Sequence, residues 1–268
     1  MLKEPVPSPP NLRTAASVIG AIILATVGAL AGLSWSGTGF TSAHVVQATF
    51  EFGSSFGITQ MGNVAGEVSL LALLAVTGAI YWRSRRSLPA MSRLIAGGIG
   101  VAVAYVTSEL LKTVFKQQRP CAALPNLAVE HCPPPGDWSL PSNHATIAFA
   151  LTTAIALTAA AATAAALPLA LVVVSARVAA AEHYPHDVID GALLGAVVTL
   201  TITALVTPHI LKLLRRLTSV QLIRPLISSA APVHAGVSSP LQSETHPPVQ
   251  STHQHQSEHH GNGGVDSP

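Results

Sequence analysis

The sequence predicts an all-α, polytopic membrane protein built as a bundle of six transmembrane helices. Of its 268 residues, 49% are hydrophobic and only 10% are charged, and the mean hydropathy is +0.47. Soluble domains usually carry about 25% charged residues. The charges gather in short clusters between apolar stretches of about 20 residues, which is the length that crosses a bilayer as a helix. The net charge of +2, without basic runs interleaved with aromatics, argues against a nucleic-acid partner.

Three separate apolar stretches predict the first three spans, at residues 14–35, 64–82 and 92–111. The first span differs from a cleavable signal peptide, because its apolar core is too long and no convincing small-residue cleavage site follows it. Residues 1–13 are then expected to form a cytoplasmic N-terminus.

One longer stretch, residues 145–181, predicts the fourth and fifth spans. Its 37 residues are nearly twice the length of one span, so the chain is expected to turn back at residues 165–170. Pro168 suits the first position of the new helix. The sixth span is expected at 187–206.

Two domain boundaries follow from this plan. The membrane domain is expected to cover residues 14–216, with a tail at 217–268. The tail is rich in Ser, Pro, Gln, Gly and His and has little apolar surface to bury, so it is predicted to be disordered.

The basic residues predict the orientation. They cluster before the first span, after the second and after the sixth, at Lys3, Arg13, 83–87 and 212–216. With six spans all these clusters fall on one side, which the positive-inside rule makes cytoplasmic. The chain is therefore expected to be integral to the plasma membrane. The loops 36–63 and 112–144 and the joint 182–187 then face outward. Cys121 and Cys132 in the second outer loop either form a disulfide or remain free thiols.

The first polar constellation follows the third span. If that helix continues, Lys112 and Arg119 project from nearly the same side about two turns apart, and Pro120 ends the helix. Two such cations repel each other unless an anion lies between them. The alternative is that both side chains extend to the lipid head groups.

The second constellation opens the fourth span. Pro141 forces Leu140 into an extended conformation, and Ser142 is a natural N-cap. The backbone N–H groups near Asn143 and His144 can then cradle an anion, and His144 can donate a proton near neutral pH. The alternative is a capped helix with an interfacial histidine.

The third constellation joins the last two spans. Arg177 lies in the final turns of the fifth span, where a guanidinium needs a partner. Pro185 is expected to open the sixth helix, so that Asp187 accepts a hydrogen bond from His183 and makes its other nitrogen a better nucleophile. The alternative is an ion pair between Arg177 and Asp187 that ties the two helices together. Two further residues are interpreted as solvated neighbours, Glu182 and His186.

Together the three constellations bring cations, N–H donors and two histidines to one membrane face. Cations with N–H donors indicate a phosphate-like oxyanion, and two histidines indicate a nucleophile and a general acid. The sequence offers no carboxylate cluster for Mg²⁺ or Zn²⁺, so the chemistry is expected to need no metal and no cofactor.

At these residues the chain resembles the PAP2 superfamily of membrane phosphatases. The signature K-x6-R-P, P-S-G-H and S-R-x5-H-x3-D is matched at 112–120, 141–144 and 176–187, in the same order and at the same spacings. The resemblance covers about residues 14–207. Two positions depart from it. Asn143 replaces a glycine and narrows the pocket, and Ala176 replaces a serine and removes one hydroxyl.

The resemblance implies a mechanism. His183 attacks phosphorus to form a phosphohistidine, Asp187 orients it, His144 protonates the leaving oxygen, and water later hydrolyses the intermediate. The residues that would hold the phosphate are Lys112, Arg119, Ser142, Asn143 and Arg177.

The function expected from these features is metal-independent hydrolysis of a membrane lipid phosphate. The substrate would be a polyprenyl pyrophosphate or a lipid of the phosphatidic acid type, whose tail stays in the bilayer. One alternative is a lipid phosphotransferase that uses the same site. Another is a transporter, which would place ionisable residues near mid-bilayer in several spans. A third, haloperoxidase chemistry on bound vanadate, belongs to soluble proteins with a related site.

Overall fold

The computed structural model describes residues 38–219, except 57, 125–126, 128 and 130–131. The chain divides into two units, residues 1–230 and 231–268, and every described residue lies in the first. The expected first span, the N-terminus before it and most of the expected tail therefore lie outside the described residues.

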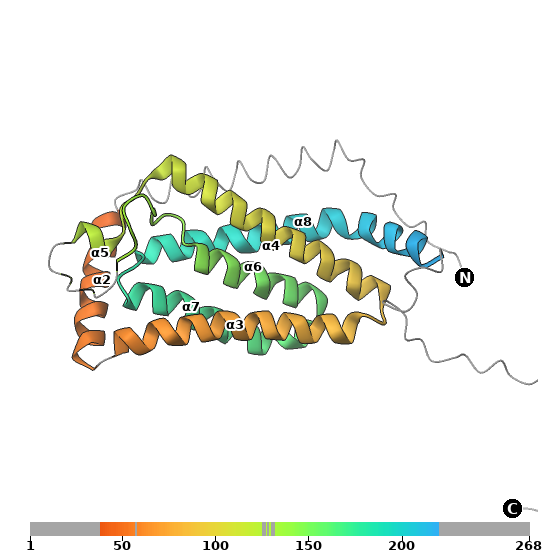
Figure 1. Ribbon diagram of the computed structural model, residues 1–268, viewed down its shortest axis with the longest axis horizontal. Helices are drawn as coiled ribbons and strands as arrows, with labels where there is room; N and C mark the ends of the chain where they lie inside the picture. The colour runs from red at the N-terminus through yellow and green to blue at the C-terminus, as the bar shows by residue number, and fades with distance from the viewer. Residues whose placement is uncertain (1–37, 57, 125–126, 128, 130–131, 220–268) are drawn as a thin grey trace, which may run out of the picture. The chain divides into compact units, whose positions relative to one another are not determined.

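The described part of the chain is helical throughout and contains no strand (Figure 1). Its elements are α2 (Thr38–Ser55), α3 (Ile58–Ser84), α4 (Leu88–Phe115), α5 (Pro120–Ala123), α6 (Asn143–Thr158), the 3-10 turn η1 (Ala160–Ala162), α7 (Thr163–Ala179) and α8 (Pro185–Ser219). Segments within α3, α4, α7 and α8 are long and apolar enough to cross a membrane. They correspond to the second, third, fifth and sixth predicted spans.

Helix α6 corresponds to the fourth predicted span and is shorter than the others. Its 16 residues extend about 24 Å, less than the hydrocarbon core of a typical bilayer. It is nevertheless central, because it packs against α3, α4, α7 and α8. Its buried face joins two apolar clusters, one with α3, α4 and α7 around Leu73, Ile155 and Val173, and one with α4 and α8 around Leu194.

Small residues bring the backbones of these helices close together. A Cβ placed on Gly195 of α8 would clash with the carbonyl oxygen of Thr146 on α6. A Cβ on Gly100 of α4 would lie 2.9 Å from the Cα of Thr199 on α8. Close packing of this kind is what holds helices together where lipid removes the hydrophobic drive for association.

The turn between the fourth and fifth spans lies earlier than predicted. Helix α6 ends at Thr158, the backbone turns at Ala159, and α7 begins at Thr163. Pro168 lies inside α7 and does not begin it. The expected turn at 165–170 was wrong because a proline can be accommodated within a membrane helix, where neighbouring helices and local adjustments compensate for the missing hydrogen bond.

The chain after the third span also differs from the prediction. Helix α4 ends at Phe115, because Lys116 takes a left-handed conformation and its N–H bonds back to the carbonyl of Lys112. Pro120 begins the short helix α5 and does not end α4. Arg119 is therefore in extended backbone before α5, and not two helical turns beyond Lys112.

Helix α2 was not predicted, because residues 36–63 were expected to form a loop. Figure 1 draws it across the end of the bundle where α6 and α8 begin. Its buried Val46 packs in a cluster with Ala181 and Tyr184, at the joint between α7 and α8. Helix α2 thus covers the joint that carries His183.

Candidate active site

The predicted site residues come together at one end of the bundle. They lie at the last turn of α4, before α5, at the start of α6, in the last turns of α7, at the α7–α8 joint and in the first turn of α8. Six of them are almost completely buried: Lys112, Arg119, Ser142, Arg177, His183 and Asp187. Buried cations are costly in an apolar protein unless anions accompany them, so their partners define the site.

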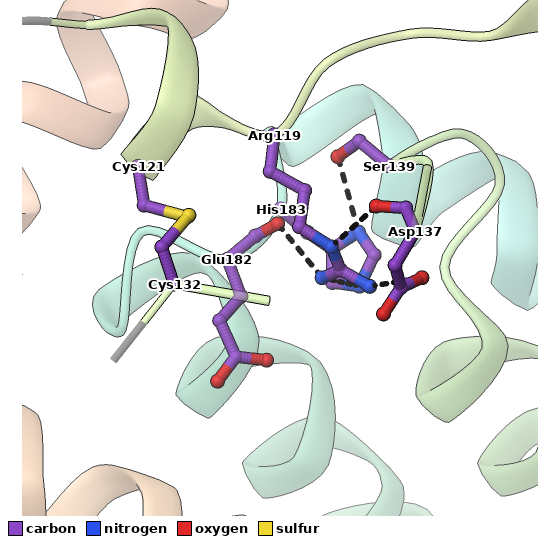
Figure 2. Close-up of a disulfide and its surroundings, with 7 residues drawn as sticks. All are labelled: Arg119, Cys121, Cys132, Asp137, Ser139, Glu182 and His183. Atoms are coloured by element: carbon purple, nitrogen blue, oxygen red, sulfur yellow. Dashed lines mark hydrogen bonds and ion pairs between the residues drawn. A yellow bond between two sulfur atoms is a disulfide. The ribbon is translucent and has the colours of Figure 1, made fainter. Parts of the chain in front are cut away.

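His183 is held in one tautomer by a hydroxyl relay, of which Figure 2 draws the contact between Ser139 and His183. Ser139 donates its proton to Asp187, so its oxygen accepts from His183 Nδ1 over 3.3 Å. With the proton on Nδ1, the lone pair of Nε2 is free to accept a hydrogen bond from Arg119 Nη1 at 3.1 Å. The unprotonated nitrogen therefore points at the guanidinium of Arg119. A phosphate bound beside His183 would place its oxygens next to the same guanidinium.

The relay differs from the expected direct contact between His183 and Asp187. The two side chains are 3.6 Å apart between Nδ1 and Oδ2, which is too long for a normal hydrogen bond. The expected effect on the ring is instead produced through Ser139. The alternative ion pair between Arg177 and Asp187 does not occur in the described structure, where Arg177 pairs with other carboxylates.

The opening of α8 explains why Asp187 is in place. Pro185 is the first residue of the helix, as predicted, and the carboxylate of Asp187 reaches back to accept the N–H of Tyr184 at 2.8 Å. Its other oxygen accepts from Gln117 and lies 3.1 Å from His186 Nε2. His186 is thus a partner of Asp187, and its interpretation as a solvated neighbour was wrong.

Burial also sets the charge of His183. The ring lies outside the helices, at the α7–α8 joint, with only 1% of its surface exposed. This burial lowers the pKa of His183 below 6.5, although the negative charge of the nearby Asp187 acts in the opposite direction. The imidazole is therefore neutral at neutral pH, which is the form that can act as a nucleophile.

Lys112 and Arg119 converge on one carboxylate, that of Asp137. Arg119 Nη2 donates to Asp137 Oδ1 at 3.0 Å, and Lys112 Nζ lies 3.6 Å from the same oxygen. Arg119 also donates through Nε to the backbone carbonyl of Asp137 and through Nη1 to that of Glu182. The two cations are therefore close in space, as expected, although a loop and not a continuous helix brings them together.

Arg177 and His144 share a second carboxylate, that of Glu67 on α3. Arg177 Nη2 and His144 Nε2 lie 3.2 and 3.3 Å from the same Glu67 oxygen. Arg177 also pairs with Glu182 at 2.9 Å, so Glu182 is not the solvated neighbour that was expected. His144 remains about one third exposed. His183 thus lies beside Arg119, and His144 lies beside Arg177.

The first turn of α6 is built as predicted around Ser142. Ser142 is the N-cap of α6 and accepts the N–H of Ala145, and its own N–H donates to the carbonyl of Asp187. The side chain of Asn143 bonds to Ser108 and Glu109 on α4. Helix α6 is therefore fixed to both α4 and α8 at the site.

Comparisons with known proteins point to a family. Residues 93–210, which include all three motifs, match the PAP2 superfamily. Over this region the chain is similar to that family. Its fold is also similar to the crystal structure of a transmembrane PAP2 type phosphatidylglycerolphosphate phosphatase from Bacillus subtilis, with a TM-score of 0.53 at 15% identity. That similarity covers 69% of this chain and 94% of the other. The protein is therefore an integral membrane protein with a PAP2 fold.

Two curated relatives are similar to part of the chain. It is 38% identical over 128 residues to decaprenylphosphoryl-5-phosphoribose phosphatase of Mycobacterium tuberculosis, strain H37Rv. It is 30% identical over 128 residues to the bacitracin transport permease protein BcrC of Bacillus licheniformis. The matches cover 47% of this chain, and 66% and 61% of the respective relatives. The chain thus spans slightly less than two thirds of the length of these relatives.

The signature that the chain resembles has a serine where this chain has Ala176, and Ala176 lies against α3. A Cβ on Gly66 of α3 would lie 2.9 Å from the Cβ of Ala176 and 3.1 Å from Arg177 Nη2. Helices α3 and α7 therefore touch at this point, and the contact brings the neighbouring Glu67 within reach of Arg177.

Sequence reasoning missed three residues that the structure brings to the site: Glu67, Asp137 and Ser139. None of them belongs to a motif, and no spacing relates them to the histidines. Ser139 and Asp137 arrive because the loop before α6 folds over the site. The same loop is tied down by a disulfide between Cys121 and Cys132, whose Cα atoms are 5.8 Å apart (Figure 2), so of the two alternatives left open by the sequence the structure has the disulfide.

Proposed function

We propose that the protein is a metal-independent phosphatase that hydrolyses a phosphomonoester or pyrophosphate of a membrane lipid through a phosphohistidine. The observation that carries this proposal is the relay at His183, which leaves Nε2 unprotonated and directed at Arg119 among buried cations. A neutral imidazole beside cations is suited to attack a phosphorus atom whose oxygens those cations hold.

In the first step His183 Nε2 forms a bond to phosphorus while the bond to the leaving oxygen breaks. His144 gives its proton to that oxygen, which leaves as a lipid alcohol or lipid phosphate. The ring of His183 becomes positively charged, and Asp187 stabilises that charge through Ser139. Lys112, Arg119 and Arg177 balance the charge on the phosphoryl oxygens.

In the second step a water molecule attacks the phosphohistidine. His144, now neutral, accepts a proton from the water as its oxygen bonds to phosphorus. The bond between phosphorus and His183 Nε2 breaks, and inorganic phosphate leaves. Both steps use protein side chains only, and each ends with His144 in the protonation state that the next step requires.

A lipid substrate agrees with the position of the site and with the names of the relatives. The site lies at the end of the membrane helices, where a head group can reach the cations while its tail remains in the bilayer. A curated relative is named for a decaprenylphosphoryl substrate. We therefore favour a polyprenyl phosphate or pyrophosphate. The basic residues at 83–87 and 212–216, at the opposite end, favour an outward-facing site.

The proposal is tested with purified protein in detergent and EDTA. Phosphate release is measured from polyprenyl pyrophosphate, polyprenyl monophosphate, phosphatidic acid and phosphatidylglycerol phosphate. We expect activity on at least one lipid, inhibition by orthovanadate, and no turnover by His183→Ala. His209→Ala, which changes a histidine within α8 well beyond the site, should retain full activity. Undiminished hydrolysis by His183→Ala would remove the proposed nucleophile. A parallel reaction with a lipid alcohol acceptor detects phosphotransfer, the alternative use of the same intermediate.

A further inference from the structure

We propose that Asp137 is a tethered anion that occupies part of the phosphate site and must be displaced by the substrate. This inference rests on the proposed function of the site, because it assumes that Lys112 and Arg119 bind the substrate phosphate. It assigns Asp137 a role in setting which anions fill the site: only an anion that binds the cations strongly can replace it.

The contacts of Asp137 are those expected of a phosphate oxygen. Its Oδ1 lies 3.0 Å from Arg119 Nη2 and 3.6 Å from Lys112 Nζ, so a single oxygen joins two cations. The same Arg119 donates to the unprotonated Nε2 of His183. A phosphate positioned for attack by His183 would need the donors of Arg119 that Asp137 now uses. The carboxylate and the phosphate therefore compete for the same place.

Burial distinguishes Asp137 from the cations that it contacts. The side chains of Lys112 and Arg119 are only 7% and 8% exposed, whereas that of Asp137 is 43% exposed. Partial burial would raise the pKa of Asp137, but the hydrogen bond and charge of Arg119, together with Lys112, lower it below 3.8. Asp137 is therefore a carboxylate at neutral pH, and it is the partner that can leave at low cost.

The structure has room for this movement. A cavity of about 180 Å³ adjoins Asp137 and is lined by Arg119, Pro133, Gly136 and Trp138. Gly136, directly before Asp137, has a φ of 97°, a conformation that favours glycine. The carboxylate can thus rotate into the cavity while the loop stays attached through the disulfide of Cys132.

Displacement of Asp137 costs the same free energy for every anion, so it lowers the binding affinity of every anion by the same factor. A phosphomonoester dianion interacts with the two cations more strongly than a monoanionic phosphodiester does, and it still binds after that penalty. The phosphodiester lipids that surround the protein in the bilayer are weaker ligands, and the same penalty keeps them from filling the site. A tethered group is effective in this role because its local concentration is high, on the order of millimolar or more.

Binding of inorganic phosphate to the full-length protein tests this inference without relying on catalysis. Titration calorimetry in detergent compares the wild type with Asp137→Asn, which removes the charge and nearly keeps the shape. We expect the Kd for phosphate to fall by about tenfold or more, the factor that corresponds to about 1.4 kcal/mol. Asp137→Ser serves as a second variant if the first fails to fold. Glu51→Gln, which removes an exposed carboxylate of α2, should leave the Kd unchanged.

A second measurement examines selectivity in mixed micelles. Phosphatidylglycerol should inhibit Asp137→Asn at mole fractions that leave the wild type unaffected. An unchanged or higher Kd for phosphate in folded Asp137 variants, or no phosphate binding by any form, would overturn the inference. Tighter phosphate binding by Asp137→Asn in a protein that hydrolyses none of the lipids would support the inference while refuting the proposed phosphatase function.

Discussion

The hydroxyl of Ser139 decides which nitrogen of His183 carries the proton. Ser139 is completely buried and lies between His183 Nδ1 and the carboxylate of Asp187. Because the carboxylate can only accept, the serine proton points toward it and the serine oxygen faces the ring. Nε2 is then left unprotonated, in the tautomer that can attack phosphorus.

Removal of this hydroxyl should slow catalysis more than it weakens binding. We expect Ser139→Ala to lower kcat by about tenfold or more, the effect of losing about 1.4 kcal/mol of stabilisation, with little change in KM. Ser92→Ala removes a buried hydroxyl from the first turns of α4 and serves as the matched control, which should retain kcat. A kcat for Ser139→Ala equal to that of the control would mean that Asp187 orients the ring without the serine.

The low pKa of His183 predicts the acid limb of the pH profile. Because burial lowers this pKa below 6.5, the neutral nucleophile persists as the pH falls through 6.5, and it becomes protonated only below that value. The acid limb of the profile should therefore lie below pH 6.5. The profile of kcat/KM is measured with two substrates whose phosphates differ in pKa, so that a limb that stays at the same pH belongs to the enzyme. An acid limb of the enzyme at or above pH 6.5 is the contrary result.

At the scale of residues, motif spacing predicted which side chains meet but not how they meet. Lys112, His144 and Arg177 were expected at the site because helix ends place them on one face. Two of the partners of these cations, Glu67 and Asp137, come from a different helix and from a loop. Their positions depend on tertiary packing, such as the contact of Gly66 with Ala176, which no local pattern encodes.

At the scale of elements, the site depends on the close contact between α6 and α8. Gly191 and Gly195 of α8 both face the backbone of α6, and a Cβ on Gly191 would lie 2.5 Å from the carbonyl oxygen of Ser142. The first turn of α6 is thus fixed directly against the helix that carries Asp187. Glycine is needed at these two positions because the helices approach closely there, and not because the backbone takes a left-handed conformation.

A methyl group at this contact should separate the helices. We expect Gly195→Ala to destabilise the protein by about 1–3 kcal/mol, as overpacking of a close contact does. Gly98→Ala in α4 is the matched control, because no atom lies within 4 Å of its added Cβ and alanine favours a helix. The melting temperature in detergent should fall by several degrees for the first variant and stay level or rise for the second. Equal melting temperatures would show that α6 and α8 are not in contact at Gly195.

The sequence predicted the helices better than their ends. Long apolar stretches identified α3, α4 and α8 because lipid requires about 20 apolar residues in a row. The turn at Ala159 lies within an alanine-rich stretch that carries no turn signal, so Pro168 attracted the prediction instead. Helix α2 was missed because its polar residues lower its hydropathy. The helix packs on the α7–α8 joint at Tyr184, a tertiary contact that the sequence does not reveal.

At the scale of the whole molecule, the two ends of the described bundle differ in chemistry. One end carries the candidate site and the disulfide loop. The other carries the basic residues at the turn from α3 to α4, from Arg83 to Arg86. Since a disulfide forms in an oxidising compartment and basic residues favour the cytoplasm, both features favour a site that faces outward.

Labelling of cysteines in intact cells tests this orientation. Ser55 and Ser87 are both exposed and flank the two ends of α3. An impermeant maleimide should label Ser55→Cys in intact cells, and Ser87→Cys only after the membrane is permeabilised. The two natural cysteines are joined and should not react. Labelling of Ser87→Cys in intact cells, with Ser55→Cys protected, would place the site on the cytoplasmic side.

The most direct measurement is an experimental structure of the protein with bound orthovanadate. We predict a single vanadate with vanadium bonded to His183 Nε2, oxygens within hydrogen-bond distance of Lys112, Arg119 and Arg177, and the carboxylate of Asp137 moved away from Arg119. Vanadate bound elsewhere, or held at this end of the bundle without contact to His183, would contradict the account.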